Sequence, residues 1–540
     1  MSLAELEEGS GHSRDNSNAA PSKALRYGRT SDFDSLDPGD TYYAFVWNFL
    51  RLLGRSLVTF RPAAGSAGQE LVPDLATSLG ATNDDAQLWT YRLRPGVRYD
   101  DGSEVTAQDV KHAIIRSNFD PDGRHGGPTY FRRYLAGPEA IEVPDPYTIT
   151  FHLVEPFAAF DYLASLPTTI PVPARRDTGP DYTIRPASSG PYQVELYRRG
   201  ERLELVPNPH WDQATDPIRR RGADRIVADL GLPGAEVDHR LITGDIDIDL
   251  AGVGVQPATM DTIMADPALR ALSDNPLIGY TWMYAINPKV APLDDVRCRR
   301  AIQYATDKHA MQAAYGGPLA GDIATTILPP TVAGHQPFDL YPCGLNHRGD
   351  VAAARAELEA AGRPEGFPVR IAARQDRLKE YGAAEALAAS LTRAGLAAEV
   401  VPFQSGDYFD LYAGVPGYVR THQIGIIMFG WAADFPDGYG FLNQIVDGRA
   451  IKPRGNHNFA EIDLPEVNDL LDRGARTRDP RVRSEVWSAI DRRVMGEALL
   501  CPYVYAKSLL LRGPRVRNAH VTGAYGMYDF VALSVARDGE

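Results

Sequence analysis

Residues 89–110 read WTYRLRPGVRYDDGSEVTAQDV and contain, in order, the end of a strand, two turns and the start of a helix. Leu88 to Leu93 alternates between apolar and polar residues, which predicts a half-buried strand. Pro95-Gly96 and Asp101-Gly102 predict turns. Thr106-Ala-Gln-Asp109 has the spacing of a capping box, so a helix is predicted to begin there. A strand that leads so directly into a helix indicates a mixed α/β chain.

The same mixture continues along the rest of the sequence. Residues 192–206 predict two strands with a turn at Arg199-Gly200, and a helix is predicted between an Asp350 cap and a Gly362 stop. The other predicted helices cover 45–57, 380–394 and 463–497, the last broken near Asp479-Pro480, and the other strands cover 147–154 and 398–402. This pattern predicts an α/β fold.

Length and composition limit the classes of protein to consider. The chain has 540 residues, 44% of them apolar, and a formal net charge of −14. So long a chain exceeds one compact core, which predicts two or more lobes. Its longest apolar stretch, residues 424–433, is about half the ~20 residues of a membrane helix. We therefore expect a soluble protein, and no nucleic-acid partner, because that would need a basic face.

The first 23 residues are rich in Ser, Asn, Gly and acidic residues. They lack the apolar core of a signal peptide, and their composition predicts a disordered tether over residues 1–23. Two interpretations stay open here: a signal was removed upstream, or the protein is intracellular.

Signatures of catalysis and of metal binding are missing from the sequence. No P-loop, HExxH or GxSxG motif occurs. Cys298, Cys343 and Cys501 form no CxxC pair, which allows one disulfide at most. Residues 245–249 (DIDID) resemble a calcium loop, but Leu250 stands where glycine is required, so a strand with inward Ile246 and Ile248 is the better interpretation. We expect no catalysis, metal or cofactor; a spatially assembled Ser/His/Asp triad stays open.

Four blocks of sequence carry the most specific signal in the chain. They are PDLA (73–76) with residues 89–97 and 101–110; SGPY (189–192) with NPHW (208–211); AIN (285–287) with DVRCRRAI (295–302) and ATD (305–307); and GWAADFPD (430–437). In this order and spacing they resemble the family 5 solute-binding proteins of ABC importers, which take up dipeptides, oligopeptides, nickel complexes and some sugars.

The resemblance implies a periplasmic-binding-protein-like fold, in which two lobes joined by a hinge are accompanied by an inserted third domain. Lobe I would comprise residues 24–54, 173–279 and 510–540, domain II residues 55–172, and lobe III residues 280–509. The ligand would lie between lobes I and III, and hinge closure would bury it.

Asp434 is the principal ligand-binding candidate that the resemblance implies. In peptide-binding relatives the matching aspartate pairs with the α-ammonium group of the ligand, and a buried ammonium needs a nearby carboxylate. The alternative is a turn aspartate before Pro436. Trp431 would form a wall of the same pocket, against the alternative of a core tryptophan.

The other candidate contacts come from separate segments. Tyr42-Tyr43-Ala44-Phe45 matches a stretch whose backbone pairs with an extended peptide in relatives, which would tolerate many side chains; an aromatic packing loop is the alternative. The remaining candidates, with core packing or solvated charge as their alternatives, are Tyr130 and Phe131 near a domain II loop, Trp282 and Tyr284 at the lobe III entrance, and Arg374, Gln375 and Asp376 after a strand.

Two departures from the family pattern stand out. Some relatives have a basic residue three positions before the tryptophan, which holds a ligand carboxylate, and Met428 occupies that position here. Those relatives also have a disulfide whose two positions are Ala432 and Tyr280 in this chain. The resemblance therefore leaves open how a ligand carboxylate is held and how long the ligand is.

We therefore predict a monomeric, extracytoplasmic substrate-binding protein that serves the membrane permease of an ABC importer. Its ligands would be oligopeptides or amino-acid-like molecules, including cationic, arginine-containing ones. One alternative keeps the fold and changes the ligand to a metal chelate, a sugar or a biosynthetic intermediate. A second alternative is an enzyme.

Overall fold

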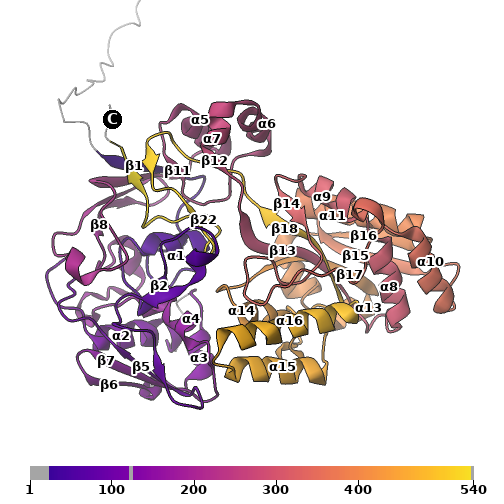
Figure 1. The fold of residues 1–540 in the computed structure, drawn as a ribbon, viewed down its shortest axis with the longest axis horizontal. Helices are drawn as coiled ribbons and strands as arrows, with labels where there is room; N and C mark the ends of the chain where they lie inside the picture. The colour runs from indigo at the N-terminus through magenta and orange to yellow at the C-terminus, as the bar shows by residue number, and fades with distance from the viewer. Residues whose placement is uncertain (1–22, 121–125, 537–540) are drawn as a thin grey trace, which may run out of the picture.

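Helices and strands mix throughout the structure, a computed structural model that describes residues 23–120 and 126–536 (Figure 1). Three sheets organise these residues, and we name them the β1, β5 and β13 sheets after one strand of each. The predicted α/β class is confirmed. The predicted tether lies outside the described residues apart from Lys23.

The β1 sheet mixes parallel and antiparallel pairing. Its strands are, in order, β11 (Ile248–Asp249), β1 (Ala24–Gly28), β10 (Arg225–Asp229), β9 (Arg202–Pro207) and β8 (Tyr192–Arg198). β1 runs parallel to both of its neighbours. The predicted turn between β8 and β9 is confirmed, and Gly200 has the positive φ of 74° that such a turn favours.

Helix α1 (Ala44–Leu50) packs against the β1 sheet but is shorter than the predicted helix over 45–57. After Leu50 the backbone carbonyl groups serve other parts of the chain. The Leu52 and Leu53 carbonyls accept the N–H groups of Tyr192 and Gly190, at 3.2 and 2.8 Å. The apolar spacing of residues 51–57 therefore reflects burial in a turn and a loop, because tertiary hydrogen bonds replace those of a helix.

The β5 sheet is antiparallel throughout. Its order is β4 (Ala81–Thr82), β5 (Leu88–Arg92), β7 (Thr148–His152) and β6 (Ile141–Asp145). Helix α2 (Ala107–Asn118) begins at the predicted capping box, where the Thr106 N–H donates to the Asp109 carboxylate at 2.9 Å. Two short helices, α3 (Tyr130–Tyr134) and α4 (Phe160–Ala164), complete this part.

The β13 sheet is the largest of the three. Its order is β14 (Gly321–Ile323), β18 (Leu500–Lys507), β13 (Leu277–Ile286), β17 (Ile424–Ala432), β15 (Pro368–Arg374) and β16 (Ala397–Phe403). The helices beside it are α8 (Val296–Ala305), α9 (Lys308–Tyr315), α10 (Val351–Ala360) and α11 (Leu378–Arg393) (Figure 1). The predicted Asp350 cap of α10 is confirmed, since its carboxylate accepts the Ala353 N–H.

Two neighbouring chain segments connect the β1 sheet region with the β13 sheet. The chain enters β13 from β12 (Ser273–Asp274) and returns from β18 into β19 (Leu510–Leu511). β12 and β19 pair antiparallel, so both crossings lie side by side, which is the arrangement of a hinge. The residue boundaries predicted for the lobes stay a prediction.

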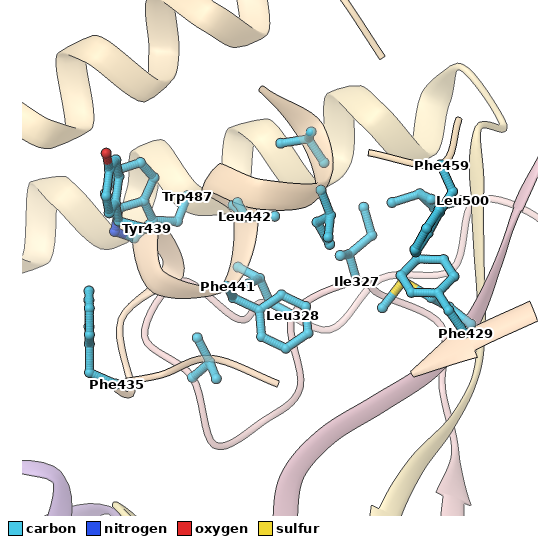
Figure 2. Close-up of a cluster of buried hydrophobic side chains, with 14 of the residues drawn as sticks. Ile327, Leu328, Phe429, Phe435, Tyr439, Phe441, Leu442, Phe459, Trp487 and Leu500 are labelled. Atoms are coloured by element: carbon cyan, nitrogen blue, oxygen red, sulfur yellow. The ribbon is translucent and has the colours of Figure 1, made fainter. Parts of the chain in front are cut away.

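Three helices pack together beside the β13 sheet: α14 (Gly438–Val446), α15 (Pro465–Arg476) and α16 (Pro480–Gly496). α15 also contacts the β5 sheet region, where the Ala158 N–H donates to the Ala475 carbonyl at 2.7 Å. Figure 2 shows Phe441 of α14 and Trp487 of α16 in a cluster of buried apolar side chains. Gly474 of α15 lies against Trp487, and a Cβ atom there would stand 2.1 Å from the indole ring. Gly438, the first residue of α14, lies against the same indole, where a Cβ atom would stand 2.5 Å from Trp487, so this packing holds the start of α14 a few residues after Asp434.

The remaining elements are short. They are α5 (Gly234–Thr243), α6 (Pro257–Ala265) and α7 (Pro267–Ala271), α12 (Ser405–Asp407) and α13 (Pro416–Thr421), and the pairs β2–β3 (Val58–Phe60, Leu71–Pro73), β20–β23 (Val516–Arg517, Ser534–Val535) and β21–β22 (Val521–Thr522, Met527–Tyr528). Cys298, Cys343 and Cys501 are buried and free. Within 23–120 and 126–536, no helix combines the length and apolarity needed to cross a bilayer.

Candidate functional site

The block GWAADFPD (430–437) forms the junction between strand β17 and helix α14. Gly430 pairs with Trp282 of β13, and a Cβ atom at Gly430 would stand 2.2 Å from the Tyr280 ring, so only glycine admits that ring. The Asp437 carboxylate caps α14 by accepting the Tyr439 N–H at 2.9 Å. Asp434 lies in the bend between these two fixed points, which sets the direction of its side chain.

The Asp434 carboxylate is held by two tyrosine hydroxyls. Tyr42, just before α1, donates to its Oδ1 at 3.0 Å, and Tyr130 of α3 donates to its Oδ2. In the described residues no basic side chain forms an ion pair with Asp434, and burial raises the pKa of this carboxyl group although both tyrosines lower it. A carboxylate in this setting attracts a cation from outside the protein.

A cavity of about 920 Å³ opens at Asp434, where residues of all three sheets meet. Tyr42 comes from the β1 sheet region, Tyr130 from the β5 sheet region, and Trp431 from β17. The Trp431 ring lies 5.2 Å from that of His457, and its Nε1 donates to the Phe441 carbonyl at 2.8 Å. The rings form an aromatic wall, a common property of sites that bury small molecules.

Charged side chains line the rest of this cavity, and most of them pair with one another. Arg133 and Glu155 lie 3.3 Å apart. Arg449 bridges Asp447 at 2.8 Å and Asp472 at 2.7 Å. The Arg133–Glu155 pair is neutral, whereas Arg449 between two carboxylates leaves one net negative charge.

The part of the chain that the structure describes holds no group of three His, Cys, Asp or Glu side chains arranged to bind a metal ion. The arrangement at Asp434 can pair with an ammonium or guanidinium group and stack an apolar or planar group against Trp431.

Comparison with known proteins identifies the family of this chain. Residues 70–453 match the family described as bacterial extracellular solute-binding proteins, family 5. The chain belongs to this family. It is similar, at 44% identity and a TM-score of 0.91 over 96% of both chains, to the structure of clavulanic acid biosynthesis oligopeptide binding protein 2. The predicted family and the periplasmic-binding-protein-like fold are thereby confirmed.

Two curated relatives show how widely the family's solutes vary. The chain is 27% identical over 495 residues to the probable D,D-dipeptide-binding periplasmic protein DdpA of Escherichia coli K12, covering 90% of this chain and 89% of the relative. It is 26% identical over 496 residues to heme-binding protein A of Haemophilus influenzae, covering 86% and 84%.

The structure of this solute-binding protein brings together four of the candidate positions. Asp434, Trp431, Tyr42 and Tyr130 all line the cavity. Tyr43 and Ala44 are exposed next to it, in the extended approach to α1 and its first turn. Phe45 instead lies in the core of the β1 sheet region, where the Arg29 guanidinium covers its ring at 3.7 Å.

Other candidates lie away from the cavity. Tyr284 is fully buried and shares a 2.6 Å hydrogen bond with Thr306, because its position on β13 points into the core. Phe131 is likewise fully buried. Trp282 is partly buried between the Tyr280 and Tyr315 rings, at 5.7 and 5.5 Å.

The interpretation of Arg374 as a solvated charge is wrong, and its contact with a ligand stays a prediction. Arg374 is buried, and its Nε donates to the Glu380 carboxylate at 3.0 Å. Asp376 instead caps the turn at Ser405, whose N–H it accepts at 3.0 Å. Met428, at the position that carries a basic residue in some relatives, is fully buried and provides no polar group to the cavity.

Sequence reasoning missed three basic residues that also line the cavity. Lys452 and His457 lie in the loop between α14 and α15, and Arg476 ends α15. No local pattern marks them, because they reach the cavity only when the α14–α15 loop folds back beside Trp431. The pKa of His457 is lowered by burial and by the nearby charge of Lys452.

Proposed function

We propose that this protein captures short peptides or amino-acid-like solutes that carry a free amine and delivers them to the membrane permease of an ABC importer. The observation that carries the proposal is the Asp434 carboxylate, which faces the cavity with two tyrosine hydroxyls and no cation in the described chain. A half-buried carboxylate without a counter-charge costs free energy, and a ligand ammonium group would offset that cost.

Capture would work by closure of the two lobes. Tyr42 and Asp434 belong to different sheet regions, and Tyr130 to a third. A solute at Asp434 therefore contacts all three and stabilises the arrangement in which they meet. Such a protein binds stoichiometrically without turnover, as a monomer outside the cytoplasmic membrane. Family membership and the word periplasmic in the name of one relative support this location.

The test uses a tetrapeptide library with free amino ends and the same library acetylated at its amino ends. We expect the parent protein to bind the free library and Asp434→Asn to lose roughly 30-fold in affinity for it by calorimetry, because one partner of a buried charge pair is gone. Asp261→Asn, an exposed carboxylate on α6, is the control. Equal affinity of the parent for free and acetylated peptides would rule the proposal out.

A second candidate keeps the fold and takes a planar or cyclic solute such as a metal chelate, a sugar or a biosynthetic intermediate. The aromatic wall of Trp431 and His457 favours it, as does the heme-binding relative. Native mass spectrometry of the purified protein distinguishes the candidates by the mass of any retained ligand, and thermal-shift measurements with heme or sugars give the second readout.

A further inference from the structure

Asn443 lines the Asp434 cavity from helix α14, although its side chain is only 2% exposed. Neither its Oδ1 nor its Nδ2 has a hydrogen-bond partner within residues 23–120 and 126–536, and no other described side chain that lines the cavity has a buried polar atom without one. Buried polar groups are almost always paired, because an unpaired one loses its hydrogen bonds to water without replacement. The fold thus leaves a donor and an acceptor at this cavity.

The position of Asn443 on α14 places the amide between two groups that are already paired. Tyr439, Asn443 and Asp447 are four residues apart, so they lie on one face of the helix, and all three line the cavity. The Tyr439 hydroxyl accepts a hydrogen bond from the Tyr134 hydroxyl at 2.9 Å. Asp447 lies 2.8 Å from the Arg449 guanidinium. On this face, the amide is therefore the group that the described chain does not satisfy.

The same face of α14 lies where two parts of the molecule meet. Tyr134 belongs to α3 in the β5 sheet region, and its hydrogen bond to Tyr439 joins that region to α14. Separation of the two parts would give a ligand access to Asn443, and closure would withdraw the amide from water together with the group bound to it. A closed-off amide discriminates strongly, because a ligand that fails to pair with it leaves a polar group unsatisfied.

The chemistry of the side chain limits which ligand group can pair with it. A carboxamide is neutral and presents an acceptor next to a donor. A carboxylate offers only acceptors and an ammonium group only donors, so neither satisfies both atoms of Asn443. Another amide does: one residue of an extended peptide presents its N–H and C=O to the same partner, as in antiparallel strands, and a side-chain carboxamide presents the same two groups.

We propose that Asn443 hydrogen-bonds an amide group of the ligand, so that the site recognises a neutral amide in addition to the amine at Asp434. The proposal deepens the proposed function and rests on it for the position of the amine. It narrows the solute class to molecules that carry both groups. Short peptides and amino acids with a side-chain carboxamide belong to this class, whereas other single amino acids do not.

The experiment uses the tetrapeptide library with free amino ends and versions of it in which one peptide bond at a time is replaced by an ester. The ester keeps the shape of the bond but lacks its N–H group. A further version omits Asn and Gln, which tests the side-chain source of the amide. We expect the parent to lose about tenfold in affinity for one of these versions, the effect of one buried group left unpaired.

Asn443→Leu replaces the amide by a side chain of similar size without polar atoms. It should bind the unmodified library about tenfold more weakly than the parent does, and it should bind the modified version equally well. Gln404→Leu removes an exposed amide outside the cavity and should keep the discrimination of the parent. Because neither polar atom of Asn443 is paired in the described chain, the urea midpoint of ligand-free Asn443→Leu should equal or exceed that of the parent.

Three results would overturn the inference. The first is a parent that binds every version equally, and the second is an Asn443→Leu variant that keeps the discrimination or binds as tightly as the parent, as expected if the amide holds only a water molecule. The third is a large loss of stability or failure to fold in Asn443→Leu, which would make the amide structural. Failure of the proposed function looks different, because then acetylation of the amino end costs no affinity.

Discussion

Two carboxylates in this protein have opposite surroundings. Asp74 is fully buried, and its oxygens lie 2.9 Å from the Arg55 Nε and 2.6 Å from the Arg219 Nη2. Both guanidinium groups are fully buried as well, and Asp216 joins the cluster at 3.4 Å from Arg219. Asp434 is half-buried, and it has two neutral tyrosine hydroxyls and no cation in the described chain.

The comparison separates a structural charge from a functional one. The Asp74 cluster connects Arg55, just after α1, with Arg219 in the loop before β10, and it is complete without a ligand. Asp434 has no positively charged partner among the described residues, and it lies at a cavity. Removal of one partner of a buried ion pair costs stability. An unpaired, half-buried carboxylate already costs stability, and a bound cation would reduce that cost.

The largest expected effect is on Asp74. Asp74→Asn keeps the shape of the side chain but leaves Arg55 and Arg219 with only the more distant Asp216, so we expect the free energy of unfolding to fall by about 3–5 kcal/mol. Urea denaturation followed by fluorescence measures this loss. Glu70→Gln, which breaks the exposed pair with Arg61, is the control and should leave the unfolding midpoint unchanged. An Asp74→Asn midpoint equal to that of the parent would contradict the structural role.

The contrast between Asp74 and Asp434 also shows which features of the structure can be predicted from the sequence alone. The capping box at Thr106, the turn at Gly200 and the Asp350 cap were predictable, because each depends on residues within a few positions. Asp434 was found through its family block. Lys452 and His457 carry no local signal, and the end of α1 at Leu50 depends on hydrogen bonds from Gly190 and Tyr192. Contacts between distant segments decide such features.

The next effect in size is a pH dependence of ligand affinity. The pKa of Asp434 is raised by burial, and the facing hydroxyls of Tyr42 and Tyr130 offset this only in part. An ammonium ligand needs the ionised carboxylate, so affinity should fall as pH decreases through the raised pKa, by up to about tenfold per pH unit. Amidated peptides exclude titration of the ligand carboxylate.

Calorimetry from neutral pH to about pH 4 measures this trend. The carboxyl of Asp216 behaves in the opposite way, because Arg219 and Arg55 outweigh burial and lower its pKa; its stabilisation is lost only in stronger acid. Asp434→Asn should remove the pH dependence of binding that arises at this site. A parent protein whose affinity for the amidated peptides is constant over this range would argue against an ionised Asp434 as the amine's partner.

The smallest effect concerns the stability of Asp434→Asn without ligand. Because burial raises the pKa of Asp434, the folded protein bears a cost for its ionised form at neutral pH. An asparagine keeps the shape, accepts a hydrogen bond from one tyrosine hydroxyl and donates one to the other. We expect the free energy of unfolding to be unchanged or to rise by about 1 kcal/mol, measured by urea denaturation after any retained ligand has been removed by unfolding and refolding. A loss of stability as large as that of Asp74→Asn would make Asp434 a structural residue. A variant that stays stable but binds more weakly would support a ligand cation as the partner of Asp434.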